Sequence, residues 1–288
     1  MLQNIYYFVG AANSTAPQDS LQSQIIALLP CLTTLRIHVT LFAYPAAMYD
    51  QTVAALASLK HIEDISFTFT MDSRLTTYST YPTQVLRIFA SSIRALGIIG
   101  GEPSWFIGDG FFSEFRPFLD GNRNISRPWS FPRLRYLELR NVRGEANIYA
   151  QIPFDTPLVT LALSFNTLFL SPLPRRRVQR LVLWVSMTQM PPSPHFEPGP
   201  SADILDLRVP IGSTMDFPLV TGFSRVVQYV SSLLGETSRK VTWKVECSIP
   251  KFHTKVKEEL QEPSVIAIFD HLAAACHKQQ LVWEMEGP

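Results

Sequence analysis

The stretch Leu134-Arg135-Tyr136-Leu137-Glu138-Leu139 has an apolar spacing that returns three times before residue 210. Each copy has an apolar residue, two variable residues, a second apolar residue, one variable residue and a third apolar residue. The copies step by 24, 20 and 24 residues, counted at the second apolar positions Leu137, Leu161, Leu181 and Leu205. Because alternate side chains of a strand point to opposite faces, the last two apolar residues of each copy enter one interior. The spacing therefore predicts a series of short strands.

Degenerate copies of this six-residue phrase occur on both sides of the central four. They begin at Leu32, Ile62 and Ile93, at steps of 30 and 31 residues, and a further copy begins at Leu2. Only the strand half of the phrase is found near the other end, in 241–245 and 281–285. The phrase therefore extends over nearly the whole chain.

A period of about 20 to 29 residues is typical of a leucine-rich repeat, in which each strand is followed by a return segment. Each repeat leaves an apolar edge that only its neighbours cover, so several must stack. The sequence predicts an α/β fold: an irregular leucine-rich-repeat-like solenoid, with a curved parallel sheet and with helices and turns on the convex side. We expect a single domain over residues 1–288, N-terminally incomplete because a copy already begins at Leu2.

The longer steps have room for helices, and apolar residues recur there at helical spacing. Three such stretches lie at 21–29, 53–57 and 85–93, and a fourth at 223–234 ends before a glycine. A last helix is expected to open at Pro263 and to bury the residues Ile268, Phe269, Leu272 and Ala275. The central return segments are too short for long helices, so turns or single 3₁₀ turns are expected there.

Two stretches do not follow the phrase. Residues 97–124 hold a glycine-rich, aromatic insertion that lengthens one step to 41 residues. Residues 191–200 contain five prolines and are expected to form an exposed, partly extended loop. Because copies of the phrase continue on both sides of each stretch, neither is interpreted as a domain boundary.

The composition of the 288-residue chain bounds its function. A formal net charge of +1 with 17% charged residues gives no reason to expect a surface for nucleic acid. The cysteines Cys31, Cys247 and Cys276 have no metal-ligand spacing and form no disulfide framework, which favours a reducing compartment. There is no signal peptide and no apolar run of about 18 residues, so no membrane partner is expected. We expect a cytoplasmic or nuclear protein.

Two proline-led copies of the phrase carry a resemblance to a known family. The stretches 131–142, which begins Phe131-Pro132-Arg133-Leu134, and 29–37, which begins Leu29-Pro30-Cys31-Leu32, are similar to the leucine-rich-repeat regions of fungal, basidiomycete-like F-box-type proteins. The resemblance covers the chain from about residue 21 onward. It implies the substrate-recognition part of a ubiquitin-ligase receptor, in which the repeats hold a target protein and an F-box binds a ligase adaptor.

The chain departs from this family at its start. An F-box is a helical module of roughly 40 to 50 residues, and the segment before residue 21 is too short for one. We therefore expect the ubiquitin-ligase adaptor as a partner only if an F-box is encoded upstream. A fragment, a mispredicted start and a stand-alone receptor all remain open.

The variable positions beside the buried leucines are the candidate binding residues, because they line the concave face of the predicted sheet. A face with aromatic residues and both signs of charge suits a protein partner. The partner-binding residues predicted on this basis are Tyr136, Glu138, Arg140, Arg180, Trp184, Asp206, Arg208 and Lys244. Val182, Lys240 and Glu284 share the same offset. We expect Arg140, Trp184 and Arg208 to contribute most, through stacking and bidentate contacts.

No catalytic, cofactor-binding or metal-binding motif is found in the sequence. It lacks a Gly-x-Ser-x-Gly elbow, a phosphate loop ending in Gly-Lys-Ser/Thr and a His-Glu-x-x-His pair. We therefore expect a non-enzymatic protein-binding domain without cofactors. An α/β enzyme with an unrecognised active site is the alternative, and a gene fragment without independent function is a third possibility.

Two local clusters have a structural and a functional interpretation. The run Arg175-Arg176-Arg177 is typical of a nuclear signal or a phosphate site, but a solvated turn before a strand is the favoured interpretation. His271 and His277 are six residues apart and lie on different faces of a helix, so a structural role is favoured over a metal site.

Overall fold

The computed structural model divides into two compact units, residues 1–158 and 159–288, which we call the N-terminal and the C-terminal unit. The structure describes residues 4–9, 31–41, 50–59, 61–71, 85–86, 88–100, 130–141, 145–165, 167, 173–185, 199–211, 219–233, 240–247, 252–278 and 282–286. The helix expected at 21–29, nearly all of the insertion 97–124 and most of the proline-rich loop lie outside these residues.

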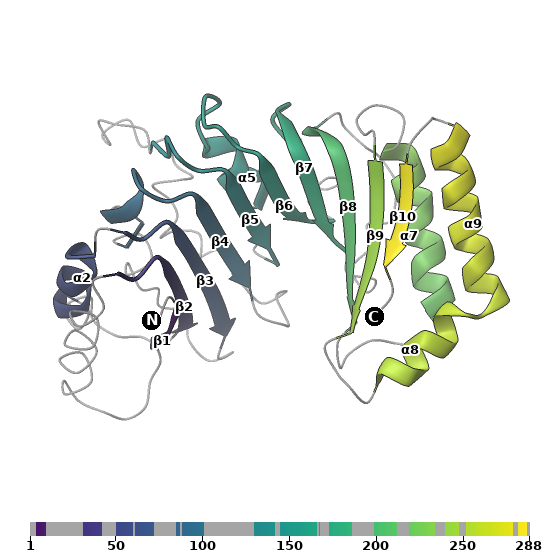
Figure 1. Ribbon diagram of the computed structural model, residues 1–288, viewed down its shortest axis with the longest axis horizontal. Helices are drawn as coiled ribbons and strands as arrows, with labels where there is room; N and C mark the ends of the chain where they lie inside the picture. Colours follow the sequence, from purple (N-terminus) through teal and green to yellow (C-terminus); the bar gives the residue numbers. More distant parts are fainter. Residues whose placement is uncertain are drawn as a thin grey trace. The chain divides into compact units, whose positions relative to one another are not determined.

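The N-terminal unit contains a parallel sheet in its described part. Its strands are β1 (Asn4–Val9), β2 (Thr34–Leu41), β3 (Asp64–Met71), β4 (Ala95–Gly100) and β5 (Tyr136–Arg140). Each strand pairs with the next one along the chain (Figure 1). The second apolar positions of successive phrases are direct register partners, in the row Ile5, Leu35, Ile65, Leu96 and Leu137. The helices α2 (Asp50–Ala57) and α5 (Glu145–Gln151) follow β2 and β5.

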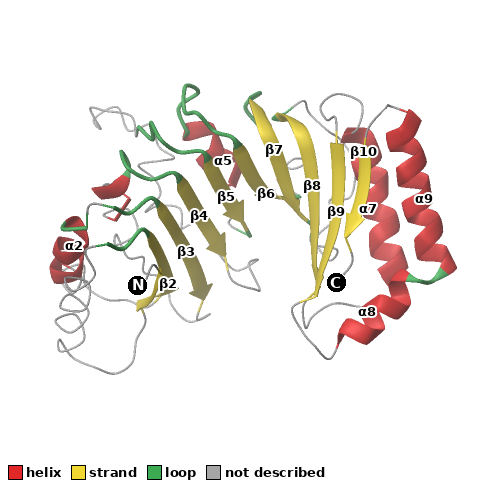
Figure 2. Ribbon diagram, viewed as in Figure 1, coloured by secondary structure: helices red, strands yellow, loops and turns green. Residues whose placement is uncertain are grey.

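The C-terminal unit repeats this arrangement with larger helices. Its strands are β6 (Thr160–Ser164), β7 (Arg177–Trp184), β8 (Ser201–Ile211), β9 (Lys240–Cys247) and β10 (Val282–Glu286), again parallel and paired in chain order. The register row here is Leu161, Leu181, Leu205, Val241 and Trp283. The helices are α7 (Leu219–Leu233), α8 (His253–Leu260) and α9 (Pro263–Lys278), shown in red in Figure 2.

A recurring backbone contact explains why each phrase begins its strand at the same place. The carbonyl of Thr33 accepts hydrogen bonds from the N–H groups of Glu63 and Asp64, at 2.9 and 3.2 Å. The carbonyl of Val159 accepts from Gln179 and Arg180 in the same way, at 2.9 and 3.1 Å. In both units, the accepting carbonyl belongs to the residue two positions before the second apolar residue of a phrase. It accepts hydrogen bonds from two consecutive N–H groups of the next phrase. This contact accounts for the two variable residues between the first and second apolar positions.

The leucines of the phrase form the interior of each unit. Leu137, Leu161 and Leu181 are at most 5% exposed, and the apolar residues of α7 and α9 cover the same face of the sheet at β9. The indole of Trp243 contacts the ring of Phe223 on α7 at 5.6 Å and the ring of Phe269 on α9 at 5.2 Å between centroids. Both contacts are edge-on, a geometry that aromatic pairs prefer. The helices of this unit are thus fixed to the leucine face.

The fold class predicted from the phrase is confirmed at the level of an α/β protein with parallel strands and a few helices. The helices predicted around 53–57 and 223–234 and from Pro263 onward are present as α2, α7 and α9. The single-domain interpretation stays a prediction. Two details were wrong. The return segment after β5 forms the short α-helix α5 where turns were expected. Of the residues predicted to be buried in α9, Phe269 and Leu272 are buried, but Ile268 and Ala275 are only half-buried, and Val265 and Cys276 are buried instead.

Candidate functional site

The side chains opposite the leucines form what we call the polar face of each sheet. In the C-terminal unit this face carries Ser164, Arg180, Val182, Trp184, Asp206, Arg208, Lys240, Thr242, Lys244 and Glu246. In the N-terminal unit its last strand carries Tyr136, Glu138 and Arg140. Alternation along a strand separates these residues from the core, and the parallel register places equivalent positions side by side. The predicted site residues therefore fall into two groups, one in each unit.

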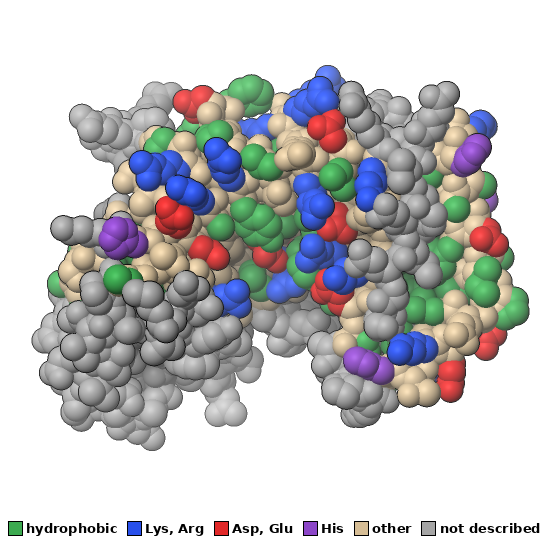
Figure 3. Space-filling view, in the orientation of Figure 1, with side chains coloured by type: hydrophobic (Ala, Val, Ile, Leu, Met, Phe, Trp, Pro, Cys, Tyr) green, Lys and Arg blue, Asp and Glu red, His purple; other side chains and the backbone are tan. Residues whose placement is uncertain are grey.

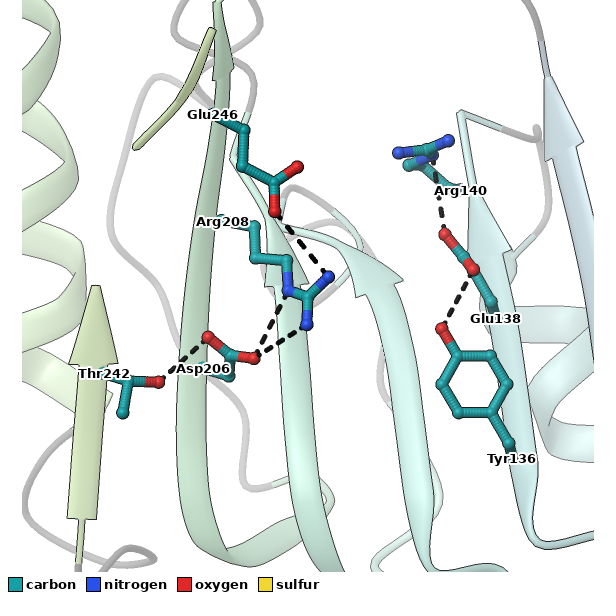
Figure 4. A network of polar contacts seen from close by, with 7 residues as sticks. All are labelled: Tyr136, Glu138, Arg140, Asp206, Arg208, Thr242 and Glu246. Carbon is teal, nitrogen blue, oxygen red and sulfur yellow. Dashed lines mark hydrogen bonds and ion pairs between the residues drawn. The ribbon is translucent and has the colours of Figure 1, made fainter. Parts of the chain in front are cut away.

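The centre of the C-terminal group is an Asp206–Arg208 pair on β8. Nε and Nη2 of Arg208 donate to Oδ2 of Asp206 at 3.3 and 3.2 Å, and the hydroxyl of Thr242 on β9 donates to Oδ1 at 2.9 Å (Figure 4). Asp206 is only 6% exposed. A buried carboxylate requires such partners, because an unpaired one would lose its hydration without replacement. Asp206 therefore holds Arg208 in place.

Two further groups fix the guanidinium of Arg208. The centre of the guanidinium lies 5.3 Å from the ring centroid of Trp184 on β7, within the range of a cation–π contact. Nη1 lies 3.8 Å from Oε1 of Glu246 on β9, which is an ion pair but too long for a hydrogen bond. The contacts of this one side chain join β7, β8 and β9. Because Asp206 occupies Nε and one side of Nη2, the N–H groups of Nη1 and the other side of Nη2 retain donors for a ligand.

The remaining cations of the group surround this assembly. Arg180 is exposed on β7, and Lys240 and Lys244 on β9 stand in the register rows of Arg180 and Arg208. Figure 3 shows basic and acidic side chains intermingled over β7–β9. Val182, which shares the offset of the predicted residues, lies on this face but is only 3% exposed. Ala162, Val182 and Asp206 form one register row of short side chains. This row lies beneath the longer side chains of the rows on either side of it.

The N-terminal group repeats the acid–arginine pair on a single strand. The hydroxyl of Tyr136 donates to Oε2 of Glu138 at 2.9 Å, and Nε of Arg140 lies 3.6 Å from Oε1 of the same carboxylate (Figure 4). The side chain of Glu138 is 12% exposed and that of Arg140 is 26% exposed. Glu138 is therefore mainly an acceptor for its neighbours, as Asp206 is.

The strands next to this group carry small and acidic side chains. Gly97 on β4 is the register partner of Glu138, and a Cβ atom at Gly97 would meet the hydroxyl of Ser66 at 2.9 Å. Asp64 begins β3, and burial raises the pKa of its carboxyl above the ordinary value, while the nearby Arg36 lowers it. Burial disfavours the charged form, and an opposite charge favours it. The surroundings of Asp64 therefore disfavour the charged form of its carboxyl.

Sequence reasoning missed Thr242 and Glu246. Both lie on β9, where only the strand half of the phrase is present, but their spacing from Val241 follows the same alternation as Asp206 and Arg208. That alternation was the signal by which both could have been found. Predicting the hydrogen bond from Thr242 to Asp206 would have required the register between β8 and β9, which cannot be read from the sequence.

The other clusters singled out in the sequence take structural positions. Arg177 forms an ion pair with Asp203 at 2.8 Å, and its side chain is 70% exposed, as expected for a solvated segment. Arg176 is buried, so the solvated-turn interpretation was wrong for this residue. His271 and His277 are both exposed on α9. The described residues contain no group of three or more His, Cys, Asp or Glu side chains able to hold a metal ion.

No protein family, no curated protein and no solved structure matches the chain significantly. Within the described residues, no helix combines the length and the apolar character that crossing a membrane requires.

Proposed function

We propose that this protein is a non-catalytic, leucine-rich-repeat-like domain that binds another protein on the polar face of its C-terminal unit. The observation that supports the proposal is the Arg208 assembly, in which Asp206, Glu246 and Trp184 hold one guanidinium between three strands. Arg and Trp are enriched among residues that dominate protein interfaces. A side chain that is already held loses less conformational freedom when a partner binds.

The proposed biological role is recognition of a substrate for a ubiquitin ligase, as the resemblance of the phrase to F-box-type proteins implies. The polar face holds the target, and a ligase adaptor is a second partner only where an F-box is joined to this chain. The protein acts in the cytoplasm or the nucleus in this role. Arg180, Trp184, Arg208 and Lys244 are the proposed contact residues, with Asp206 positioning Arg208 beneath them.

Site-specific photo-crosslinking tests the binding face. A photoreactive amino acid replaces Arg180, which is exposed on β7 beside the Arg208 assembly, and a control variant carries it in place of Lys257, which is exposed on α8. We expect a discrete crosslinked protein from position 180 and not from position 257. The same product is expected to disappear when Trp184→Leu and Arg208→Gln are introduced together. Equal products from both positions would contradict the proposed site.

The fate of the crosslinked protein tests the role in ubiquitin transfer. We expect its half-life in the native cell to lengthen when this gene is deleted and to return when the wild-type gene is restored. A gene that carries Arg208→Gln is expected to fail to restore it. If the half-life of the crosslinked protein is the same in all strains, the ubiquitin-ligase role is contradicted, while the proposed binding is not.

A further inference from the structure

Resting on the proposed function, we propose that the partner presents an acidic segment, whose carboxylates bind the polar face over β7–β9 with Arg208 as the anchor. The first observation is the charge of this face. Its described side chains on these strands include the cations Arg180, Arg208, Lys240 and Lys244, and the carboxylates are Asp206 and Glu246. Four cations against two carboxylates give a cationic excess in a chain of net charge +1.

The second observation is where the two carboxylates point. Asp206 and Glu246 both contact Arg208, at 3.2 and 3.8 Å, so both carboxylates of the face help to hold this guanidinium. Arg180 is exposed at the opposite end of the same polar face and stands in the register row of Lys240. An acidic segment that runs from Arg180 on β7 past Arg208 on β8 to Lys244 on β9 meets a cation on each of these strands. Such complementarity raises association rates and selects between partners.

The third observation is the orientation of Arg208. Asp206 occupies Nε and one side of Nη2, and Cζ of Arg208 lies over the ring of Trp184, 5.3 Å from its centroid. The remaining edge, formed by Nη1 and the other side of Nη2, is the fork that binds a carboxylate through two parallel hydrogen bonds. Oε1 of Glu246 lies 3.8 Å from Nη1, which is too far for a hydrogen bond, so Glu246 does not occupy this pair of donors.

The same geometry favours a carboxylate over a phosphate group. A phosphate monoester carries close to two negative charges, and like charges nearby disfavour it. Asp206 and Glu246 stand within 4 Å of the anchoring guanidinium. On β10, Glu284 and Glu286 occupy the register rows of Thr242 and Lys244. The cationic excess therefore belongs to β7–β9, and we place the acidic segment there.

Peptide binding to the full chain tests this inference. The probe is a fluorescent peptide of about eight residues with Glu at alternate positions, long enough at about 3.3 Å per residue to cross three strands about 4.8 Å apart. Matched probes replace Glu with Gln or with phosphoserine. We expect the Glu peptide to bind about tenfold more tightly than the Gln peptide at low ionic strength, with the preference falling as salt is added. A stronger preference for phosphoserine would overturn the carboxylate assignment.

Variants locate the binding on the face. Arg208→Gln is expected to weaken binding of the Glu peptide about tenfold, and Arg180→Gln about threefold. Lys257→Gln on α8 removes the same charge away from the face and is expected to leave affinity unchanged. Arg180 has no ion pair in the described residues, so its variant tests the site even if Arg208→Gln fails to fold. Equal losses in all three variants would mean that only net charge is sensed and would overturn the inference.

The peptide and crosslinking results separate the two proposals. If the Glu and Gln peptides bind equally while a partner still crosslinks at position 180, the acidic segment is wrong and the protein-binding function stands. If crosslinking at position 180 gives no specific product while the Glu peptide keeps its preference, the acidic-ligand site stands without the proposed protein partner.

Discussion

The two units carry the same four-residue pattern, leucine, acid, leucine, arginine, and they use it differently. In the N-terminal unit, Glu138 receives the hydroxyl of Tyr136 from its own strand and has Arg140 at 3.6 Å. In the C-terminal unit, Asp206 receives two hydrogen bonds from Arg208 and one from Thr242 on the next strand. Asp is one methylene shorter than Glu, so its carboxylate stays closer to the sheet, where the hydroxyl of Thr242 on β9 donates to it. The register partner of Glu138 on β4 is Gly97, which has no side-chain donor. The residue opposite the acid on the neighbouring strand therefore distinguishes the two pairs.

The largest difference is expected when each acid is removed. Asp206→Ala leaves Arg208 and Thr242 without their shared acceptor, and we expect the free energy of unfolding to fall by about 3 kcal/mol, as for other buried ion pairs. Glu138→Ala removes one hydrogen bond, from Tyr136, and a longer ion pair with Arg140, so a loss of about 1 kcal/mol is expected. Urea denaturation of the full chain, followed by tryptophan fluorescence and by circular dichroism, measures both. Equal losses of stability would show that the hydrogen bond from the neighbouring strand to Asp206 does not distinguish the two acid–arginine pairs.

A smaller difference is expected when the hydroxyl donors are removed. Thr242→Val keeps the shape of the side chain and removes the donor to Oδ1 of Asp206. We expect it to cost about 1.5 kcal/mol, and Tyr136→Phe to cost about 0.5 kcal/mol, because a hydrogen bond to a more buried charged group contributes more. Thr242→Ser keeps the hydroxyl and serves as the matched control. If Ser and Val variants unfold at the same urea concentration, packing of the γ-methyl group and not the hydrogen bond explains the loss.

The aromatic partner of Arg208 has a still smaller expected effect. Trp184→Leu removes the cation–π contact, which contributes about 0.5 to 1 kcal/mol at a partly exposed site. Because Asp206 and Glu246 still hold Arg208, we expect the hydrogen bonds on β8 to persist and the change in stability to stay near 1 kcal/mol. The double variant with Asp206→Ala sharpens this comparison. Adding the two single effects is expected to overestimate the double loss, since both act on one guanidinium.

The sequence allowed the strands to be predicted because their signal is local. One register row of the C-terminal unit runs through the second apolar positions of its phrases, so counting from Leu161 to Leu181 and Leu205 already placed the strands in line. It also placed Asp206 and Arg208 on the polar face. What alternation does not contain is depth, since Asp206 and Arg208 share a face while one is buried and the other is 29% exposed.

Contacts between strands were harder to predict than positions along them. Thr242 belongs to a copy of the phrase that keeps only its strand half, so no leucine spacing marked it as the partner of Asp206. The helices were predicted where apolar stripes are long, as in α7 and α9. The short helix α5 has only seven residues, fewer than periodicity needs for a clear signal.

The smallest expected effect concerns Asp64 in the N-terminal unit, whose carboxyl has its pKa raised by burial and lowered in part by Arg36. A carboxyl whose pKa is raised in the folded state adds stability below its unfolded pKa, and that contribution is lost as the pH rises through the folded pKa. The free energy of unfolding is therefore expected to fall less in Asp64→Asn than in the wild type as the pH rises from 3.8, the ordinary pKa of the carboxyl, to neutral pH. Arg36→Gln is expected to raise the pKa of Asp64 further, because it removes the opposing charge. Carboxyl titration by NMR measures the shift, and a lower pKa in Arg36→Gln would show that Arg36 does not act on this group.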